Sequence, residues 1–300
     1  MLSIGKASFI LLKIIKLVTS GKHYPLVRKF SRIVILSLLV PFSAKAQTLQ
    51  TPLLSPYTGL SAYSSGHSDV FSFTNNNASL AGLKNISAGV FGERRFLLNE
   101  LNNFMAVAGM PTHSGNFGLK ATYSGFTDYN ETQLGLAYAR KLGKKVDIGA
   151  QFNYNGIRIA GYGNAAAVSF ELGSILHITE KLHTGIQVNN PVGGKFGKEQ
   201  EKLPSVYSFG VGYEASEKFL LTAEIEKEEN QPINVNAGFQ YRFIPQLQVR
   251  AGVSSAASIV WAGAGIRLNA VRIDITSSYH PQLGVTPGLL LLFDINKVKE

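Results

Sequence analysis

The 300-residue sequence contains no cysteine and a single tryptophan. Without cysteine the chain has no disulfide scaffold, no Cys-ligated zinc site and no lipobox thiol for acylation. The part after residue 46 also has no apolar run near the about 20 residues that a membrane helix needs. Any attachment to a membrane therefore has to come from the fold itself.

Acidic residues are missing from the first 46 residues, which carry eight of the 29 Lys and Arg. Arg28, Lys29 and Arg32 precede an apolar core from Ile33 to Phe42, and Ala44-Lys45-Ala46 forms a small-x-small cleavage pattern. We therefore predict that residues 1–46 are a signal peptide and that the protein is exported. The remaining chain has 21 Lys and Arg against 19 Asp and Glu, so its net charge is near +2 and not the +10 of the full sequence.

A second apolar run, Ala7 to Val18, precedes this signal and is interrupted by Lys13 and Lys16. It is too short and too charged to span a bilayer. One interpretation is a start codon assigned too far upstream, with the true signal beginning near Val27. The alternative is an amphipathic cytosolic extension.

Apolar and polar side chains alternate from Ile233 to Arg242, in the segment Ile-Asn-Val-Asn-Ala-Gly-Phe-Gln-Tyr-Arg. This period of two is typical of a strand with one apolar and one wet face. The pattern recurs from about residue 86 to 295, and most repeats have the about ten residues of a tilted membrane strand. About fourteen strands are predicted: 86–95, 102–111, 116–126, 131–141, 145–157, 164–175, 181–190, 205–215, 218–227, 232–243, 246–255, 259–269, 271–280 and 287–296.

The connections between these segments alternate between longer and shorter, as in outer-membrane barrels with long outer loops and tight periplasmic turns. Leu142 to Lys144 and Ser216-Glu217 are examples of the tight class, and Pro191 to Pro204 is the longest of the other class. We expect both ends of the barrel segment in the periplasm. A soluble β-sandwich also alternates, but its polar faces carry abundant charge, whereas these are rich in Gly, Ser and Asn. We therefore predict an all-β fold, an antiparallel transmembrane β-barrel spanning residues 86–300, in which closure leaves no free edge.

Residues 47–85 lack sustained alternation and contain scattered Pro, Gly and Ser. We expect an extended piece, an Asn cluster able to cap, and one short helical turn, together forming a hatch inside the lumen. The alternative is a disordered periplasmic leader, but the apolar residues here need burial. The predicted hatch residues are Val70, Phe71, Phe73, Asn75, Asn76, Asn77, Leu80 and Leu83.

Charged side chains on the inferred inner faces have mixed signs, so we expect them to pair across the lumen and to close its middle. The predicted lumen charges are Lys120, Glu171, Glu224, Arg242, Arg250, Arg267, Arg272 and Asp274. Arg94-Arg95 is expected at the outer rim, where the usual outcome is solvation and the alternative is contact with lipopolysaccharide phosphates. The loop around Lys195 to Lys202 mixes both signs, which argues against nucleic-acid binding.

The sequence gives little support for catalysis, a metal site or a cofactor. Ser65-Gly66-His67-Ser68-Asp69 contains the residue types of a hydrolytic triad, but neighbours in an extended segment point to opposite sides. No Gly-x-Ser-x-Gly elbow and no His-x-x-x-His pair occurs. His177 and His183 flank the turn at Glu180, so they could approach each other, but we expect two solvated histidines near a turn. We predict no enzyme activity, no metal and no cofactor.

Two short motifs resemble a known family. Asn75-Asn76-Asn77-Ala78-Ser79-Leu80-Ala81 is similar to the Asn-Pro-Ala-x-Leu-Ala box before the first strand of FadL-like barrels, including the PorV/PorQ group of type IX secretion. Asn77 stands where that box has proline. Leu203-Pro204, which opens a strand after Asn190-Pro191, is similar to a mid-barrel segment of PorV/PorQ-like proteins. The resemblance covers nearly the whole chain after residue 46.

This resemblance implies a barrel of about fourteen strands with an N-terminal hatch in the outer membrane of a Gram-negative bacterium. One branch of the family passes hydrophobic small molecules and another serves protein export. The short outer loops offer little surface for a folded cargo, so the expected function is uptake or passage of hydrophobic small molecules. The alternative is a non-transporting accessory of protein export that binds secretion-system proteins. The expected surroundings are outer-membrane lipid and lipopolysaccharide.

Overall fold

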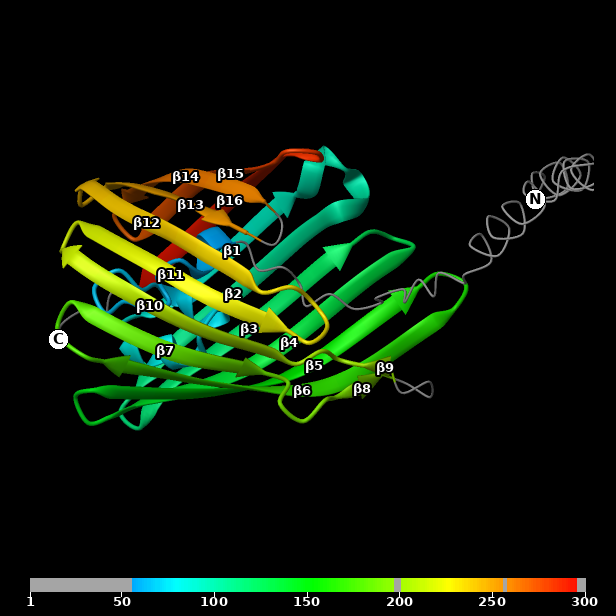
Figure 1. Ribbon diagram of the computed structural model, residues 1–300, viewed down its shortest axis with the longest axis horizontal. Coiled ribbons are helices and arrows are strands. Elements are labelled where there is room, and N and C mark those ends of the chain that lie inside the picture. The colour runs from blue at the N-terminus through cyan, green and yellow to red at the C-terminus, as the bar shows by residue number, and fades with distance from the viewer. Residues whose placement is uncertain (1–55, 197–200, 256–257, 296–300) are drawn as a thin grey trace, which may run out of the picture. The chain divides into compact units, whose positions relative to one another are not determined.

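The chain from residue 86 onward forms a closed antiparallel barrel of 14 strands in the computed structural model, which describes residues 56–196, 201–255 and 258–295. Each strand pairs with its neighbour along the chain, and β1 closes the ring against β16 (Figure 1). The strands are β1 (Ile86–Arg94), β2 (Asn102–Thr112), β3 (Gly115–Gly125), β4 (Tyr129–Leu142), β5 (Val146–Ile159), β6 (Gly163–His177), β7 (Leu182–Asn189), β10 (Val206–Ser216), β11 (Phe219–Glu228), β12 (Asn234–Ile244), β13 (Leu247–Ser254), β14 (Ile259–Leu268), β15 (Val271–His280) and β16 (Gly284–Ile295).

The predicted barrel is confirmed, and all fourteen predicted strands are present with boundaries that agree to within about three residues. The largest difference is at β16, which begins at Gly284 because Pro287 lies inside the strand, opposite Ser277. One hairpin was not predicted. Its strands, β8 (Lys195–Phe196) and β9 (Glu201–Lys202), are too short to produce a visible alternation.

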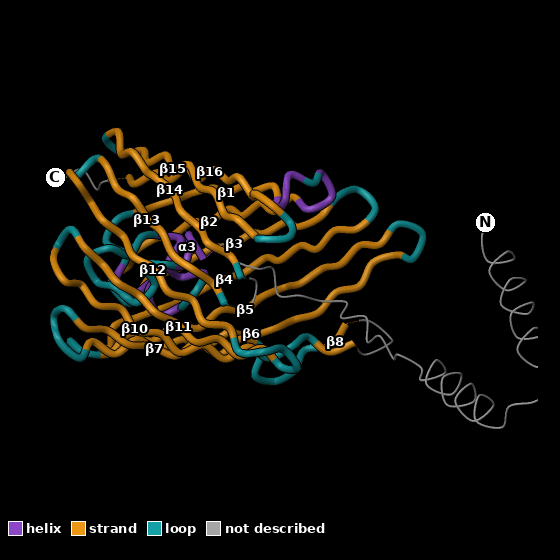
Figure 2. The backbone as a smooth tube through the Cα atoms, turned by 45° about the horizontal axis from the view of Figure 1, so that its top comes forward, coloured by secondary structure: helices purple, strands orange, loops and turns teal. Residues whose placement is uncertain are grey.

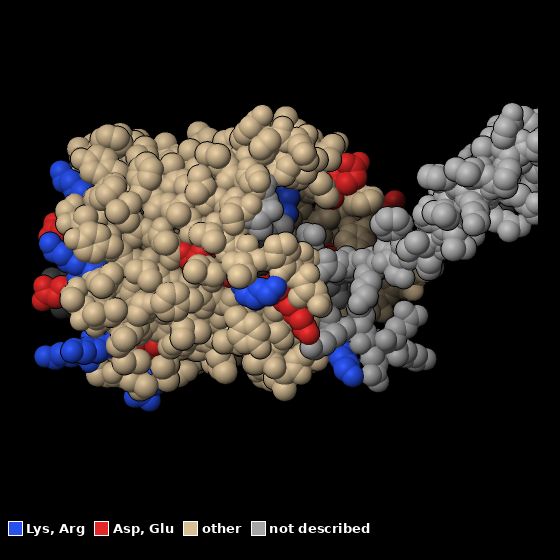
Figure 3. Space-filling view, in the orientation of Figure 1, with Lys and Arg blue, Asp and Glu red and all other residues tan. Residues whose placement is uncertain are grey.

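The outer face of the barrel is a belt of exposed apolar side chains. Along β11 and β12, Leu221, Ile225, Val235 and Phe239 are each more than a third exposed, while their neighbour Gln240 is fully buried. Few charged side chains interrupt the visible wall between its two ends, and many gather where the short turns lie (Figure 3). Apolar surface of this extent in a closed barrel is the form that spans a membrane with strands.

The two ends of the barrel differ. The turn end carries tight connections such as Thr112 to Gly115, Leu142 to Val146 and Ile244 to Leu247. The loop end carries longer ones, including residues 190–205 and the turns η3 (Arg95–Leu97) and η4 (Asn99–Leu101). In the described part of the chain, no helix has the length and apolar character needed to cross a membrane.

Residues 56–85, here called the plug, lie inside the ring of strands (Figure 2). They contain α3 (Pro56–Gly59) and two 3-10 helices, η1 (Val70–Thr74) and η2 (Asn77–Gly82). The Asp69 side chain caps η1 and the Asn76 side chain caps η2. The prediction of an extended piece before the Asn cluster was wrong, because the cap at Asp69 begins a helical turn there, whereas the predicted capping by the Asn cluster and the turn after it are present.

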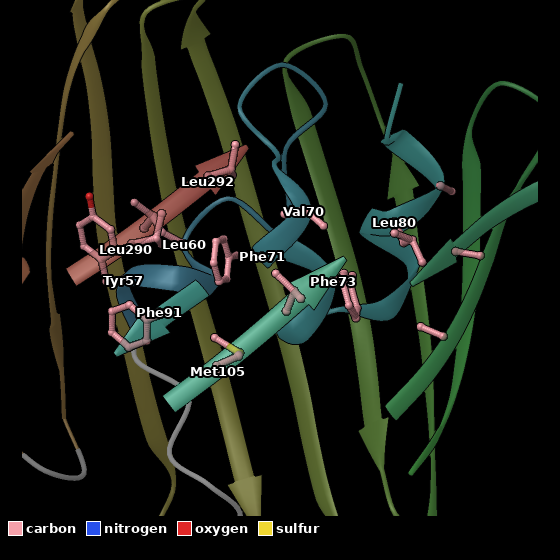
Figure 4. Packing of buried hydrophobic residues seen from close by; sticks show 14 of the residues in the cluster. Tyr57, Leu60, Val70, Phe71, Phe73, Leu80, Phe91, Met105, Leu290 and Leu292 are labelled. Carbon is pink, nitrogen blue, oxygen red and sulfur yellow. The ribbon is translucent and has the colours of Figure 1, made fainter. Parts of the chain in front are cut away.

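Apolar residues of the plug pack against the inner wall of the barrel. Phe71 and Phe73 are fully buried, and around them lie Met105 and Leu290 from the strands (Figure 4). Glycines in the wall permit this close approach: a Cβ at Gly149 would lie 2.5 Å from the Asn77 carbonyl carbon. The lumen is therefore filled by the chain's own N-terminal segment and not by wall side chains alone.

Candidate functional site

The plug is fixed to the barrel wall by an ion-pair network centred on Asp69. Its Oδ2 accepts hydrogen bonds from Arg272 Nη2 at 2.8 Å and from Arg250 Nη2 at 3.1 Å. Both arginines are almost fully buried. Burial alone would raise the pKa of Asp69, but the positive charges of Arg272 and Arg250 outweigh it and hold that pKa below its usual value. Asp69 is therefore ionised at neutral pH.

Two further contacts extend this network across the lumen. Arg272 Nε donates to Asp274 at 3.0 Å, and Tyr57 Oη of the plug donates to the same carboxylate at 2.9 Å. Arg250 donates to the Tyr57 carbonyl oxygen at 3.2 Å, and its guanidinium lies 5.2 Å from the Tyr57 ring centroid. The plug thus supplies both an anion and an aromatic ring to the wall cations.

The asparagine box anchors the other side of the plug. Asn76 Nδ2 donates to the carbonyl oxygen of Ile186 at 3.2 Å, which ties the plug to the backbone of β7. The Asn77 backbone N–H donates to Gln187 Oε1 at 3.2 Å, and Asn77 Nδ2 lies 3.3 Å from Glu171. Glu171 also pairs with Lys120 at 3.4 Å. These contacts give the Asn-rich motif a physical role as a docking segment.

A third anchor joins the middle of the plug to β11. Glu224 accepts hydrogen bonds from Tyr63 Oη at 2.7 Å and from Asn75 Nδ2 at 2.8 Å. Tyr63 packs against β10, where a Cβ at Gly210 or Gly212 would collide with it. Burial raises the pKa of the Tyr63 hydroxyl, and the Glu224 charge raises it further, so this hydroxyl stays a donor.

Glu214 of β10 holds the chain at the turn end of the plug. Its Oε1 accepts from the Ser65 and Gly66 backbone N–H groups at 2.6 and 3.0 Å and from Ser64 Oγ at 2.8 Å. Nearby, Arg242 Nη2 donates to the Gly66 carbonyl oxygen at 3.2 Å. Arg242 therefore faces the lumen, and Phe239 faces outward.

The remaining predicted residues also lie in the lumen or on its plug. Arg267 pairs with Asp294 at 2.5 Å near the turn end. Val70 and Leu80 are buried, and Leu83 is half-buried beside them. The expected pairing across the lumen needs correction for Arg250 and Arg272, since both pair with Asp69 of the plug and only Arg272 also pairs with a wall residue, Asp274. Strand alternation placed these charges on the inner face but did not identify Asp69 as their common partner.

The expectation that His177 and His183 are both solvated was wrong. His183 is 1% exposed, and its Nδ1 lies 2.8 Å from Nδ1 of His177. Asp147 lies 2.9 Å from His177 Nε2, and Glu214 lies 3.2 Å from His183 Nε2. The turn between β6 and β7 brings both rings to the inner face, where the carboxylates of neighbouring strands meet them. No group of three His, Asp or Glu able to hold a metal occurs among the described residues.

Ser65 and His177 form the nearest approach to a hydrolytic arrangement, with Ser65 Oγ 3.3 Å from His177 Nδ1 and Asp147 on the other ring nitrogen. An acyl-transfer site also needs free backbone N–H groups beside the nucleophile to bind an oxyanion. The N–H groups of Ser65 and Gly66 instead donate to the Glu214 carboxylate. We therefore assign these residues to plug docking.

A cavity of about 350 Å³, here called the vestibule, opens on the loop-end side of the plug. Leu60 and Tyr63 of the plug line it together with Ile259 and Trp261 of β14. Polar wall groups such as Thr222 and Glu226 lie around these apolar residues. Trp261 is 4% exposed, and its Nε1 has no hydrogen-bond partner in the described part of the chain. Most residues around the vestibule are polar, among them Lys120, Glu171, Glu224 and Glu228, so its apolar residues form one patch within a mixed lining.

A second cavity, of about 420 Å³, lies at the turn end and is here called the turn-end cavity. It is more polar than the vestibule. Arg242, Arg267 and Arg272 line it from the wall, and residues 65–69 and 79–85 of the plug line it from within. The plug therefore separates a hollow of mixed lining from a basic one.

No family model and no curated protein matches this sequence. Solved structures do match. The monoaromatic hydrocarbon channel CymD aligns with a TM-score of 0.57 and 12% identity, over 77% of this chain and 94% of CymD. The toluene transporter TbuX of Ralstonia pickettii aligns with a TM-score of 0.56 and 9% identity, over 76% and 94%. A Pseudomonas aeruginosa FadL homologue aligns with a TM-score of 0.57 and 10% identity, over 76% and 94%.

The fold is FadL-like. At identities near a tenth, the likeness establishes the barrel and no residue role. The predicted FadL-like architecture is thereby confirmed. The residues that sequence reasoning missed include Tyr57, Tyr63, Asp69 and Gln187, each of which joins plug to wall. Only the capping pattern around Asp69 carried a signal for any of them.

Proposed function

We propose that this protein is an outer-membrane channel for hydrophobic small molecules, in which the plug gates the lumen. The observation that carries the proposal is the vestibule, a hollow with an apolar patch that plug and wall build jointly inside a FadL-like barrel. Neighbours of this fold include a monoaromatic hydrocarbon channel and a toluene transporter. Small aromatic or aliphatic solutes fit a hollow of this size and lining.

The filled lumen determines how such a solute has to move. Phe71, Phe73 and the Asp69 network occupy the barrel between the vestibule and the turn end. A solute that enters the vestibule can therefore go further only when the plug shifts or when it leaves sideways. This arrangement is incompatible with a general porin, whose lumen is an open aqueous channel.

Within the described residues, the ladder between β6 and β7 is incomplete on the loop-end side. β6 has 15 residues, but β7 has 8 and pairs only with the β6 segment from Glu171 to His177. Beyond this point, Phe196 from the loop packs on Ala167 of β6 and on Ile157. A side-chain contact is weaker than a strand ladder, so this is the favoured place for a sideways exit to the lipid.

The proposed location is the outer membrane, with the turn end in the periplasm and the loop end outside. The apolar belt fits lipid, and Arg95, which pairs with Glu93 at 3.1 Å, lies at the loop end where lipopolysaccharide would be met. The expected signal peptide, residues 1–46, lies outside the described residues. The predicted absence of enzyme activity fits neighbours that are channels.

Toluene influx into cells that express the protein tests this function directly. We expect influx above that of cells without the barrel, and we expect Thr222→Trp to suppress it because residue 222 faces the vestibule. Ala223→Trp is the matched control, since residue 223 is exposed on the outer face. Equal influx in cells with and without the wild-type barrel would refute the proposal.

The alternative role, as an export accessory, is separated by affinity purification with lipid mass spectrometry. Bound apolar molecules support passage through the barrel. Secretion subunits in stoichiometric amounts, with no bound apolar molecule, would replace the channel proposal.

A further inference from the structure

The turn-end cavity has an excess of positive charge. Lys84, Arg242, Arg267 and Arg272 line it, against Asp69 and Asp294. Arg272 is paired with Asp69, and Arg267 is paired with Asp294. Within the described residues, Arg242 and Lys84 form no ion pair, and Arg242 donates to the neutral Gly66 carbonyl oxygen. Two cations are thus left without an anion beside one hollow.

A hydrogen-bond relay determines which groups border this hollow as donors. Arg250 Nε donates to Gln240 Oε1 at 2.9 Å, so the amide nitrogen of Gln240 is fixed as a donor. That nitrogen donates to His67 Nδ1 at 3.1 Å and to Gln248 Oε1 at 3.4 Å. With its oxygen used as an acceptor, Gln248 has its NH₂ group left over. This nitrogen has no hydrogen-bond partner in the part of the chain that the structure describes.

The plug places two more buried polar side chains beside the turn-end cavity, Ser79 and His67. Ser79 Oγ is buried and has no hydrogen-bond partner among the described residues. Because His67 Nδ1 accepts from Gln240, the proton of the neutral ring lies on Nε2, which has no hydrogen-bond partner among the described residues. Buried donors without an acceptor are costly, and they point to a missing partner. These donors and cations together fit a ligand whose polar atoms are all hydrogen-bond acceptors.

We propose that the turn-end cavity binds a small oxyanion, a carboxylate or a phosphate, through Arg242, Lys84, Gln248 and Ser79. A compact anion satisfies two cations and two neutral donors at once, and each charge-assisted hydrogen bond is stronger than a neutral one. Leu80, Leu83 and Pro245 also line the cavity and give an organic acid an apolar surface to contact. The site is distinct from the vestibule and does not depend on passage of a solute.

Calorimetric titration of the purified barrel in an uncharged detergent at low salt tests the proposal, with inorganic phosphate and benzoate as separate probes. We expect saturable binding of at least one anion. Tighter binding of benzoate identifies an organic acid as the ligand class, and tighter binding of phosphate identifies a phosphate group. We expect Arg242→Gln to weaken binding about tenfold or more.

The matched control is Arg140→Gln, which removes the same charge from the same end. Arg140 is exposed and lies opposite Ile148 on the outer face, so its loss should leave binding within about twofold of the wild type. Heat-modifiable migration on a gel shows whether each variant forms the barrel. If Arg242→Gln does not form the barrel, Lys84→Gln takes its place in the titration, and weaker anion binding is expected for it.

Absence of saturable binding of both anions to the wild type would overturn the proposal, and so would wild-type affinity in the cavity variants. Because binding is measured on the purified protein, anion binding can be observed even if the barrel does not increase toluene influx. Toluene influx can likewise be observed without anion binding.

Discussion

Oδ2 of Asp69, in the plug, lies 2.8 Å from Nη2 of Arg272, on the barrel wall, although the two residues are separated by 203 positions in the sequence. Arg250 reaches the same oxygen from β13. One carboxylate therefore neutralises two buried cations and joins the N-terminal segment to the last third of the barrel. Removing the Asp69 carboxylate therefore leaves cations of the wall unpaired and releases a contact of the plug at the same time.

Asp69→Asn should destabilise the docked plug by about 3–5 kcal/mol, because two buried arginines lose their shared anion. Urea denaturation in detergent measures the loss, and limited proteolysis reports whether residues 56–85 become accessible. Asp294→Asn is the control: Asp294 pairs with Arg267 within the wall, so this change should leave the plug protected. Equal protection of the plug in the wild type and in Asp69→Asn would contradict the assigned role.

Gly149→Val should displace η2 from the wall. A Cβ at this position would lie 2.5 Å from the Asn77 carbonyl group and 2.6 Å from the Ala78 nitrogen, and both are backbone atoms that cannot turn away. Gly92→Val is the comparison, since its nearest neighbour is the Phe104 side chain, which is exposed and free to move. We expect bilayer conductance to rise in the first variant only, and similar traces for both would count against the packing described.

Asn77→Pro tests the position where the plug motif departs from its FadL-like counterpart. Asn76 has φ −140° and ψ 115°, a conformation that permits a following proline, and residue 77 is the first of η2. Proline fits the backbone but removes the N–H bond to Gln187 and the contact with Glu171. We expect a loss of about 1–2 kcal/mol. Asn77→Ala, which keeps the N–H, should lose less, and the opposite order would disprove this reading of the box.

Acid should weaken the plug through His67. Burial and, after it, the positive charge of Arg242 lower the pKa of His67 to about 4. Between pH 6.5 and about 4, His67 is protonated in the unfolded chain but not in the folded chain. The contribution of His67 to the free energy of unfolding is therefore fully present above pH 6.5 and decreases toward pH 4. His67→Gln lacks this effect. Its melting temperature should fall about 2–4 °C less than that of the wild type between pH 7 and 4.5, and parallel decreases would contradict the assignment.

The barrel could be predicted from the sequence because alternation is a local property. Each strand, such as β12, shows its two faces within ten or so residues, and the spacing of the turns then gives the order of the strands. The start of β16 was predicted too late in the sequence because proline usually lies outside a strand, whereas Pro287 lies within β16.

The docking of the plug could not be predicted in the same way. The partner of Asp69 depends on which inner-face residues reach the same depth of the lumen, and this depends on the stagger of strands far apart in the sequence. His177 and His183 are direct partners in the β6–β7 hairpin, so their approach is local, whereas the Glu214 carboxylate that meets His183 comes from the neighbouring strand β10. Inner and outer faces follow from the pattern, whereas contacts across the lumen require the closed structure.

Conductance across a planar bilayer tests most directly the central claim that the protein's own N-terminal segment closes the lumen. The wild-type barrel should show little or no steady current, and a variant lacking Val70 to Leu83 should conduct in discrete steps, because that deletion removes η1, η2 and their apolar contacts with the wall. Indistinguishable traces from the two proteins would contradict the account.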